Sequence, residues 1–197
     1  KSSVREIEYG KIYQSLNIQT ISYMKYVLDF YRNISGVNAF PCGIFYFTLH
    51  SPNVKYKFNF DLENDIYKNH KYEGIFTDDI NKLTLIDKNL KNNSSNIIPI
   101  KLTKDGEFSK NISLDRVLSD EEFNLLLEFV HESIKNKLRE IFSGYININP
   151  ILSTCESKTC ENCDYLGICK FSRNTNPFEI LMTLNKQSFF ELIKGDF

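Results

Sequence analysis

Three cysteines within ten residues constrain this chain more than any other feature of its sequence. They occur with the spacing Cys160-x2-Cys163-x5-Cys169. Two thiolates separated by two residues can chelate a single metal centre, and a third thiolate five residues later suits a compact knuckle. The cysteines of the chain do not spread along it like a disulfide framework. The pattern therefore predicts a metal or cluster site in a reducing compartment.

The spacing leaves the identity of this metal centre open. Zinc needs four ligands, and Cys155 is a candidate for the fourth. The series Cys155-x4-Cys160-x2-Cys163 also has the spacing of plant-type ferredoxins. In the alternative arrangement, the fourth thiolate lies upstream of residue 1. The residues alone do not decide between these arrangements.

The charge balance argues against an autonomous nucleic-acid-binding domain. Lys and Arg total 24 against 25 Asp and Glu, whereas a stand-alone DNA binder is usually more basic. Any DNA contact must therefore be local or shared with a partner. No apolar run approaches the roughly 18–20 residues that a membrane span needs, and the start at Lys1 lacks an initiator Met and a signal peptide. We expect a cytoplasmic protein, with no membrane partner, whose sequence opens within a longer chain.

The hydrophobic pattern predicts helices that flank short apolar strands, which favours an α/β fold. Residues 16–34 have the spacing of a helix that is buried over much of its girth, with Gly36 as its stop. Residues 41–49 form an aromatic and β-branched run typical of an interior strand. Residues 97–102 form a second strand candidate, which Pro99 confines to an edge or a strand start.

Two helix starts are predicted from capping residues. Ser119 and Glu122 form a capping box, and the helix behind it runs to Gly144 with apolar side chains on one face. Asn176-Pro177 has the chemistry of an N-cap followed by a proline at the first helical position, which predicts a final helix.

Several other polar residues have an ordinary structural explanation. The histidines His50, His70 and His131 are isolated from one another, and Asp78-Asp79 is interpreted as a solvated turn without a partner. Cys42 precedes a strand-like run and is interpreted as a small buried hydrophobic residue. None of these residues predicts a site.

Taken in order, the motifs resemble the nuclease domain at the C-terminus of AddB/RexB-type helicase–nuclease B subunits. Lys1-Ser2-Ser3 is similar to the end of that family's Asp-Tyr-Lys-Ser-Ser strand, and Gln19-Thr-Ile-Ser-Tyr23 to its Gln-x3-Tyr helix. Residues 98–109 and 143–150 resemble its Lys-Asp-Gly-x-Phe-Ser and Gly-x-Ile-x-Ile-x-Pro elements. The tail from Cys160 to Phe171 resembles its cluster-binding tail.

The resemblance implies a cofactor and a set of ligands. Such proteins hold a [4Fe–4S] cluster, with Cys160, Cys163 and Cys169 matching three of its four ligands. The first ligand would then lie upstream of residue 1, and Cys155 would be an additional cysteine.

The resemblance also implies catalytic roles for Lys1, Gln19 and Tyr23 in an Mg²⁺-dependent DNA exonuclease. The family's metal-binding carboxylates precede residue 1, so the fragment alone is expected to be inactive. Ser15 stands where many relatives have Gly before the Gln-x3-Tyr motif.

The expected fold is an α/β restriction-endonuclease-like PD-(D/E)xK core, truncated at its N-terminus, with a cysteine-rich C-terminal extension. Residues 1–150 would belong to the nuclease core, and residues 151–197 to the iron–sulfur tail and terminal helix. The implied partners are DNA and a helicase–nuclease A subunit in a heterodimer that processes double-strand breaks for recombinational repair. The alternatives are a non-catalytic, iron–sulfur-stapled DNA-binding module and a free-standing Cas4-like nuclease.

Overall fold

The structure is a computed structural model that describes residues 7–47, 71–92, 94–95, 97–109, 114–153, 160 and 163–195. The described residues fall into two compact units. One unit contains residues 7 and 19–127, and the other contains residues 8–18 and 128–195. The second unit is therefore assembled from two segments that are distant in the sequence. The predicted division at residue 150 stays a prediction.

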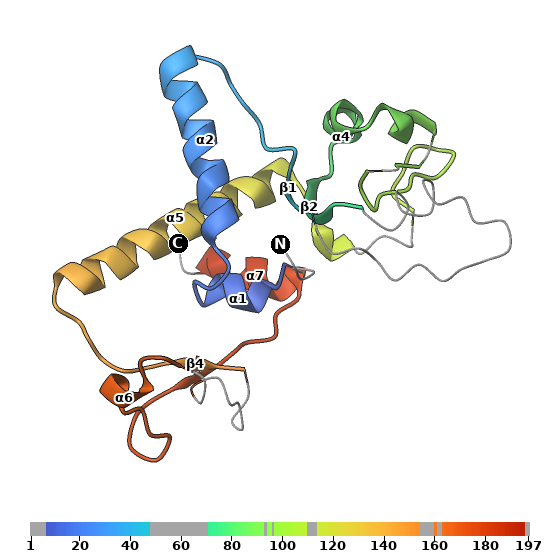
Figure 1. The fold of residues 1–197 in the computed structure, drawn as a ribbon. Coiled ribbons are helices and arrows are strands. Elements are labelled where there is room, and N and C mark those ends of the chain that lie inside the picture. The colour runs from blue at the N-terminus through green and yellow to red at the C-terminus, as the bar shows by residue number, and fades with distance from the viewer. Residues whose placement is uncertain are drawn as a thin grey trace, which may run out of the picture. The chain divides into compact units, whose positions relative to one another are not determined.

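The first unit is built on a three-stranded sheet with the order β1-β2-β3 (Figure 1). β1 (Gly43–Tyr46) pairs antiparallel with β2 (Glu73–Thr77), and β2 pairs parallel with β3 (Val117–Leu118). The strand predicted over residues 41–49 is present but shorter. In the described part of the sheet it lies at an edge, whereas β2, with four of its five residues buried, is the central strand.

A small hydrophobic core packs beside β2. α4 (Ile80–Ile86) and η1 (Lys88–Asn92) follow this strand. The core consists of Phe76, Leu83, Leu90, Ile98 and Ile100. The strand predicted over residues 97–102 is not a regular strand. Pro99 has no N–H to donate to a ladder, and the segment makes only isolated bridges at Lys101 and Leu102 while it buries Ile98 and Ile100.

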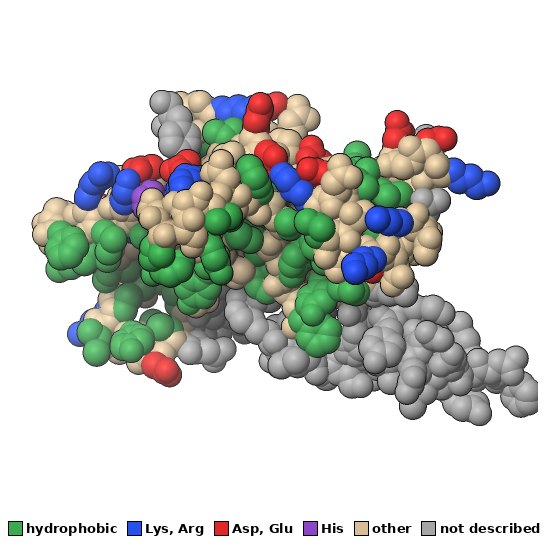
Figure 2. Space-filling view, turned by 90° about the horizontal axis from the view of Figure 1, so that it is seen from above, with side chains coloured by type: hydrophobic (Ala, Val, Ile, Leu, Met, Phe, Trp, Pro, Cys, Tyr) green, Lys and Arg blue, Asp and Glu red, His purple; other side chains and the backbone are tan. Residues whose placement is uncertain are grey.

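The helix predicted over residues 16–34 is α2 (Gln19–Ser35), and its predicted burial is wrong. Only Ile21 and Leu28 of this helix are buried. The opposite face carries large hydrophobic side chains, all of them exposed: Tyr23, Tyr26, Val27, Phe30 and Ile34. Hydrophobic side chains are also visible across the surface drawn in Figure 2. The apolar spacing predicted the helix correctly but could not tell which of its apolar faces is covered.

The capping box predicted at Ser119 and Glu122 is confirmed. The Glu122 amide donates to Ser119 Oγ at 3.2 Å, and the Ser119 amide donates to Glu122 Oε2 at 2.9 Å. Such a cap stabilises a helix by about 1 kcal/mol. α5 (Asp120–Phe142), which follows the short η2 (Leu114–Arg116), ends in a Schellman motif at Gly144, whose φ is +78°. In this motif the Gly144 amide donates to Ile141 and the Tyr145 amide donates to Glu140.

The second unit has an aromatic core. α1 (Tyr9–Tyr13) lies against α7 (Lys186–Gly195) (Figure 1). Tyr9 contacts Phe189 and Phe190 at ring-centroid distances of 5.1 and 6.2 Å. Tyr13 stacks on Phe129 of α5 at 5.8 Å with an interplanar angle of 5°. Burial of each large aromatic ring contributes about 1.5–3 kcal/mol, so these contacts fix α1 within this unit.

The helix predicted to start at Asn176-Pro177 is absent, and the chain there is extended. β5 (Glu179–Ile180) pairs parallel with β4 (Ile151–Leu152). The Asn176 side chain instead accepts from the Ser172 amide at 2.9 Å and closes a turn. α7 begins later, where the Asn185 side chain accepts from the Ser188 amide at 2.8 Å. Asn185 therefore provides the cap that sequence reasoning assigned to Asn176.

The mixed helices and small sheets confirm the α/β class. None of the helices formed by the described residues combines the length and the hydrophobicity needed to cross a membrane.

Replacement of Gly10 by alanine should destabilise the second unit. An added Cβ would lie 1.7 Å from the Met182 carbonyl oxygen and 2.7 Å from its carbon. Forcing a methyl group into such a contact typically costs about 1–3 kcal/mol. Helix propensity alone predicts the opposite sign, a gain of about 1 kcal/mol.

Limited trypsin digestion of the parent protein measures this effect through cleavage at Lys170, Arg173 and Lys186, which flank β5. Cleavage in Gly10→Ala should accelerate by about tenfold, because each 1.4 kcal/mol changes an open population tenfold. Gly195→Ala is the matched control, because a Cβ there meets no atom within 4 Å. Equal digestion of the two variants would contradict the close contact at Gly10.

Candidate functional site

Gln19 and Tyr23 lie together at the start of α2. Gln19 Nε2 donates to Tyr23 Oη at 2.7 Å, and both side chains are exposed. This hydrogen bond confirms that the two residues of the Gln-x3-Tyr motif share one helix face. The first turn of α2 carries no acidic side chain. A carboxamide and a phenol at the positive end of a helix dipole are suited to contact an anionic group such as a phosphate.

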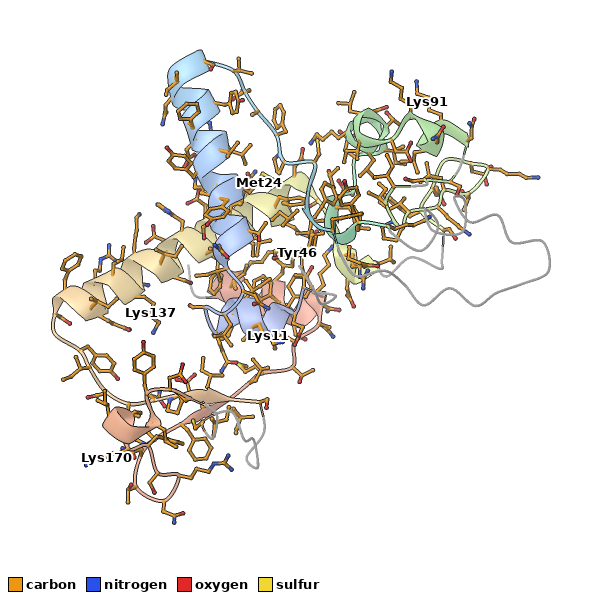
Figure 3. The ribbon with its side chains drawn as sticks, in the orientation of Figure 1. Lys11, Met24, Tyr46, Lys91, Lys137 and Lys170 are labelled. Atoms are coloured by element: carbon orange, nitrogen blue, oxygen red, sulfur yellow. The ribbon has the colours of Figure 1, made fainter. Side chains whose placement is uncertain are left out.

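The start of α2 is fixed to the sheet beneath it. The hydroxyls of Thr20 and Tyr46 lie 3.0 Å apart, and Tyr46, labelled in Figure 3, is the last residue of β1. Ile21 is 2% exposed and anchors the same turn on its buried side. Gln19 and Tyr23 therefore project from a turn that is held in place by neighbouring residues on the opposite face.

The turn that leads into α2 has an unusual backbone. Ser15 and Asn17 have φ values of +60° and +49°, a region that residues other than glycine seldom occupy. The backbone of Ser15 is in the left-handed region that glycine adopts readily. This turn is the covalent connection between α1 and the Gln-x3-Tyr motif.

Lys1, the third candidate catalytic residue, lies outside the described residues, as do Ser2 and Ser3. His50, His70 and Cys155 lie outside them as well. His131 is half-buried within α5.

The described cysteines of the tail lie on a tightly turned backbone. The Cys163 amide donates to the Cys160 carbonyl at 3.2 Å. Cys169 ends α6 (Leu166–Cys169), and its amide donates to the Tyr165 carbonyl at 2.8 Å. Lys170, labelled in Figure 3, then takes a left-handed φ of +50°. The turn at Cys160–Cys163 and the short helix α6 thus place the three cysteines on one short stretch of chain.

None of the described cysteines Cys160, Cys163 and Cys169 forms a disulfide bond. Cys160 and Cys169 are half-buried, and Cys163 is exposed. Three cysteines without disulfide bonds, on a turned backbone, are a donor set that suits a thiolate-ligated centre. Among the residues whose positions are described, no three His, Cys, Asp or Glu side chains are grouped closely enough to hold a metal ion.

The structure brings together charged residues that sequence reasoning kept apart. Asp78 and Asp79 follow β2, and Asp120 follows β3, which is parallel to β2. Lys82 Nζ contacts both carboxylate oxygens of Asp120, at 2.6 and 2.7 Å. Lys82 Nζ also lies 3.9 Å from Asp79 Oδ2, so the prediction that Asp78-Asp79 has no partner nearby is wrong. The parallel pairing of β2 and β3 explains why these aspartates lie close together, because the carboxyl ends of parallel strands lie at one edge of a sheet.

The members of this acidic cluster have structural roles. The Asp79 carboxylate accepts from the amides of Asn81 and Lys82 and caps α4. Although the Asp78 side chain is exposed, partial desolvation and then the nearby Asp120 carboxylate raise the pKa of Asp78. The half-buried Cys42 also lies close by, and its burial raises the pKa of its thiol. A raised pKa keeps this thiol protonated, which agrees with its interpretation as a packing residue.

Comparison with known proteins identifies the chain's relatives. No protein-family model matches it. Curated proteins described as the B subunit of an ATP-dependent helicase/deoxyribonuclease match it from end to end. The identity is 32% over 200 residues for the protein of Alkaliphilus metalliredigens, 31% over 203 residues for that of Bacillus thuringiensis and 27% over 201 residues for that of Bacillus pumilus.

Each of these alignments covers 100% of this chain and 17% of the relative. The chain thus spans about one sixth of the length of the curated relatives that it matches. The motifs at Gln19–Tyr23 and at the three tail cysteines lie within this shared region. The chain is therefore homologous, along its whole length, to one segment of the B subunits of ATP-dependent helicase/deoxyribonucleases.

Proposed function

We propose that the chain is the C-terminal part of a DNA exonuclease subunit, in a helicase–nuclease that processes double-strand breaks for recombinational repair. The observation that carries this proposal is the similarity, over 100% of the chain, to proteins described as the B subunit of a helicase/deoxyribonuclease. The expected partners are DNA and the A subunit of the same enzyme. The near-neutral charge of the chain agrees with a DNA path that is shared with other parts of the assembly.

The proposed chemistry is hydrolysis of a phosphodiester bond. The oxygen of a water molecule bonds to phosphorus, the bond from phosphorus to the sugar oxygen breaks, and the departing oxygen takes up a proton. A bound Mg²⁺ ion supplies polarisation of the phosphate and activation of the water. Its carboxylate ligands are expected upstream of residue 1, in a PD-(D/E)xK core that this chain completes.

The chain's own residues would act on the charged phosphate. The Lys1 ammonium would stabilise negative charge that develops on the phosphate oxygens. Gln19 would donate from its carboxamide to the scissile phosphate or the attacking water, and Tyr23 would orient that carboxamide through their 2.7 Å hydrogen bond. The exposure of both side chains agrees with a role at a surface that DNA reaches.

The proposed role of the tail is to hold a [4Fe–4S] cluster through Cys160, Cys163 and Cys169, with a fourth cysteine far upstream. Three cysteines that form no disulfide bond and the turned backbone at Cys160–Cys163 support this assignment. A bound cluster supplies a cross-link that closes a long loop, which stabilises the folded state by restricting the unfolded chain.

Lys1→Ala in the parent protein should reduce Mg²⁺-dependent DNA cleavage by about 10²- to 10³-fold. Loss of one group that stabilises developing oxyanion charge typically has this effect. Single-turnover cleavage of linear DNA by the complete enzyme measures it, with the exposed Lys104→Ala as a control. Full cleavage by Lys1→Ala would remove Lys1 from the mechanism.

Gln19→Ala should slow cleavage while leaving stability almost unchanged. A side-chain pair one helical turn apart contributes only about 0.2–0.5 kcal/mol to a helix. Gln187→Ala is a matched control, because Gln187 Nε2 donates to Glu191 Oε1 at 2.9 Å in the same i,i+4 geometry on α7. Cleavage rates and thermal unfolding of both variants are compared. Normal activity per folded molecule, together with lost stability, would show that Gln19 is only a packing residue.

Serine substitution of Cys160, Cys163 or Cys169 should abolish the broad visible absorbance of the purified parent protein, because each change removes one cluster ligand. The absorbance should survive Cys155→Ser. It should also survive the control Cys42→Ser, because Cys42 lies in the first unit and the tail cysteines lie in the second. Absorbance and iron content are measured together. A colourless wild-type protein with one zinc per chain would refute the iron–sulfur assignment. Loss of the cluster in Cys155→Ser would show that the chain itself supplies all four ligands.

A further inference from the structure

The Gln14 side chain, in the turn after α1, contacts the backbone that follows the cysteine tail. Its Nε2 donates to the Ile180 carbonyl at 3.1 Å, and its Oε1 accepts from the Met182 amide at 2.9 Å. One carboxamide therefore contacts a carbonyl and an amide that lie on either side of Leu181. A neighbouring β-strand would satisfy the same two groups with its own peptide.

The opposite edge of this segment is already paired with β4. The amide of Leu181 donates to the Leu152 carbonyl at 2.8 Å, and the amide of Glu179 donates to the Pro150 carbonyl at 3.0 Å. Backbone groups alternate between the two edges of an extended chain, so Gln14 occupies the edge that β4 leaves open. The segment is thus held on one side by a strand and on the other by a single side chain.

Two further observations show that the contact is built into the fold. The Glu179 carboxylate accepts from Asn149 Nδ2 at 2.8 Å and from Gln14 Nε2 at 3.4 Å. It therefore links the Gln14 clamp, meaning the contacts of Gln14 with Ile180 and Met182, to the chain before β4. On α1, four residues before Gln14, Gly10 has no Cβ and leaves room for the Met182 carbonyl. Lys11, labelled in Figure 3, marks the same helix.

We infer that Gln14 is a positioning residue that ties the cysteine tail to α1 and so steadies the turn leading to Gln19. This inference rests on the proposed nuclease function. Gln14 lies five residues before Gln19, and the intervening turn contains Ser15 and Asn17 with positive φ values. Such a backbone persists only where neighbouring elements hold it. The contacts of Gln14 with Ile180 and Met182 connect the cysteine tail to a residue only five positions before Gln19. DNA cleavage should therefore depend on an intact tail.

The test uses Gln14→Leu and Gln14→Glu in the complete enzyme, with Gln187→Leu as the control. Leucine removes both contacts to the strand, whereas glutamate keeps an acceptor for the Met182 amide and loses the donor to Ile180. Residue-resolved amide exchange of Met182 is measured beside kcat, KM and iron content. The glutamate variant also serves as the folded comparison if the leucine variant aggregates.

We expect the Met182 amide to exchange about 2- to 10-fold faster in Gln14→Leu, which corresponds to one lost hydrogen bond. Gln14→Glu should also exchange faster than the wild type, because its carboxylate loses the donor and faces the Glu179 carboxylate, and Gln187→Leu should match the wild type. The kcat for linear DNA should fall in both Gln14 variants, by up to the ~100-fold that a 1 Å misplacement can cause. KM should not change, because the proposed role of Gln14 is to position Gln19 and not to bind DNA.

The outcomes separate the two proposals. Unchanged Met182 exchange in Gln14→Leu would overturn the clamp, even if the wild-type enzyme cleaves DNA. Faster exchange with normal kcat would overturn the positioning role. A wild-type enzyme that cleaves no DNA would overturn the nuclease proposal and with it the positioning role, while Met182 exchange would still decide whether the clamp exists.

Discussion

The close approach of α1 to the backbone around Met182 is the constraint on which the second unit depends. Gly10 leaves room for the Met182 carbonyl, and Gln14 binds the edge that this approach exposes. The same helix presents Tyr9 to the aromatic side chains of α7. One short helix therefore joins residues near both ends of the described chain. A five-residue helix has little stability of its own, so its position is determined by these contacts.

The first unit depends on a different principle, a buried central strand with short neighbours. β2 pairs with β1 on one side and β3 on the other, and its residue Phe76 contributes to the core. The parallel pairing with β3 also brings Asp120 to the residues that follow β2. Lys82 compensates this local negative charge through its paired contacts with Asp120. This charge cluster is a consequence of the topology, in which Asp79 caps α4 and Asp120 pairs with Lys82.

The roles proposed for the nuclease residues rest on different kinds of observation. The Gln19–Tyr23 hydrogen bond and the anchoring of Thr20 on Tyr46 are direct features of the structure. The cluster assignment rests on thiol chemistry and on a turned backbone. The proposed role of Lys1 rests on the resemblance of its Lys-Ser-Ser motif to that of the AddB/RexB-type family and on the similarity of the whole chain to helicase/deoxyribonuclease B subunits.

The sequence by itself determined the features that depend on neighbouring residues. The capping box at Ser119, the stop at Gly144 and the shared face of Gln19 and Tyr23 follow from spacings of three or four residues. The tertiary structure alone decided which apolar face of α2 is covered and that Asn185, rather than Asn176, caps the last helix. It alone also brought Asp78 near Asp120 and Gln14 to β5. Local patterns indicate what a segment can form, whereas burial and long-range pairing depend on partners that are distant in the sequence, 26 residues away for Thr20 and Tyr46 and 166 for Gln14 and Ile180.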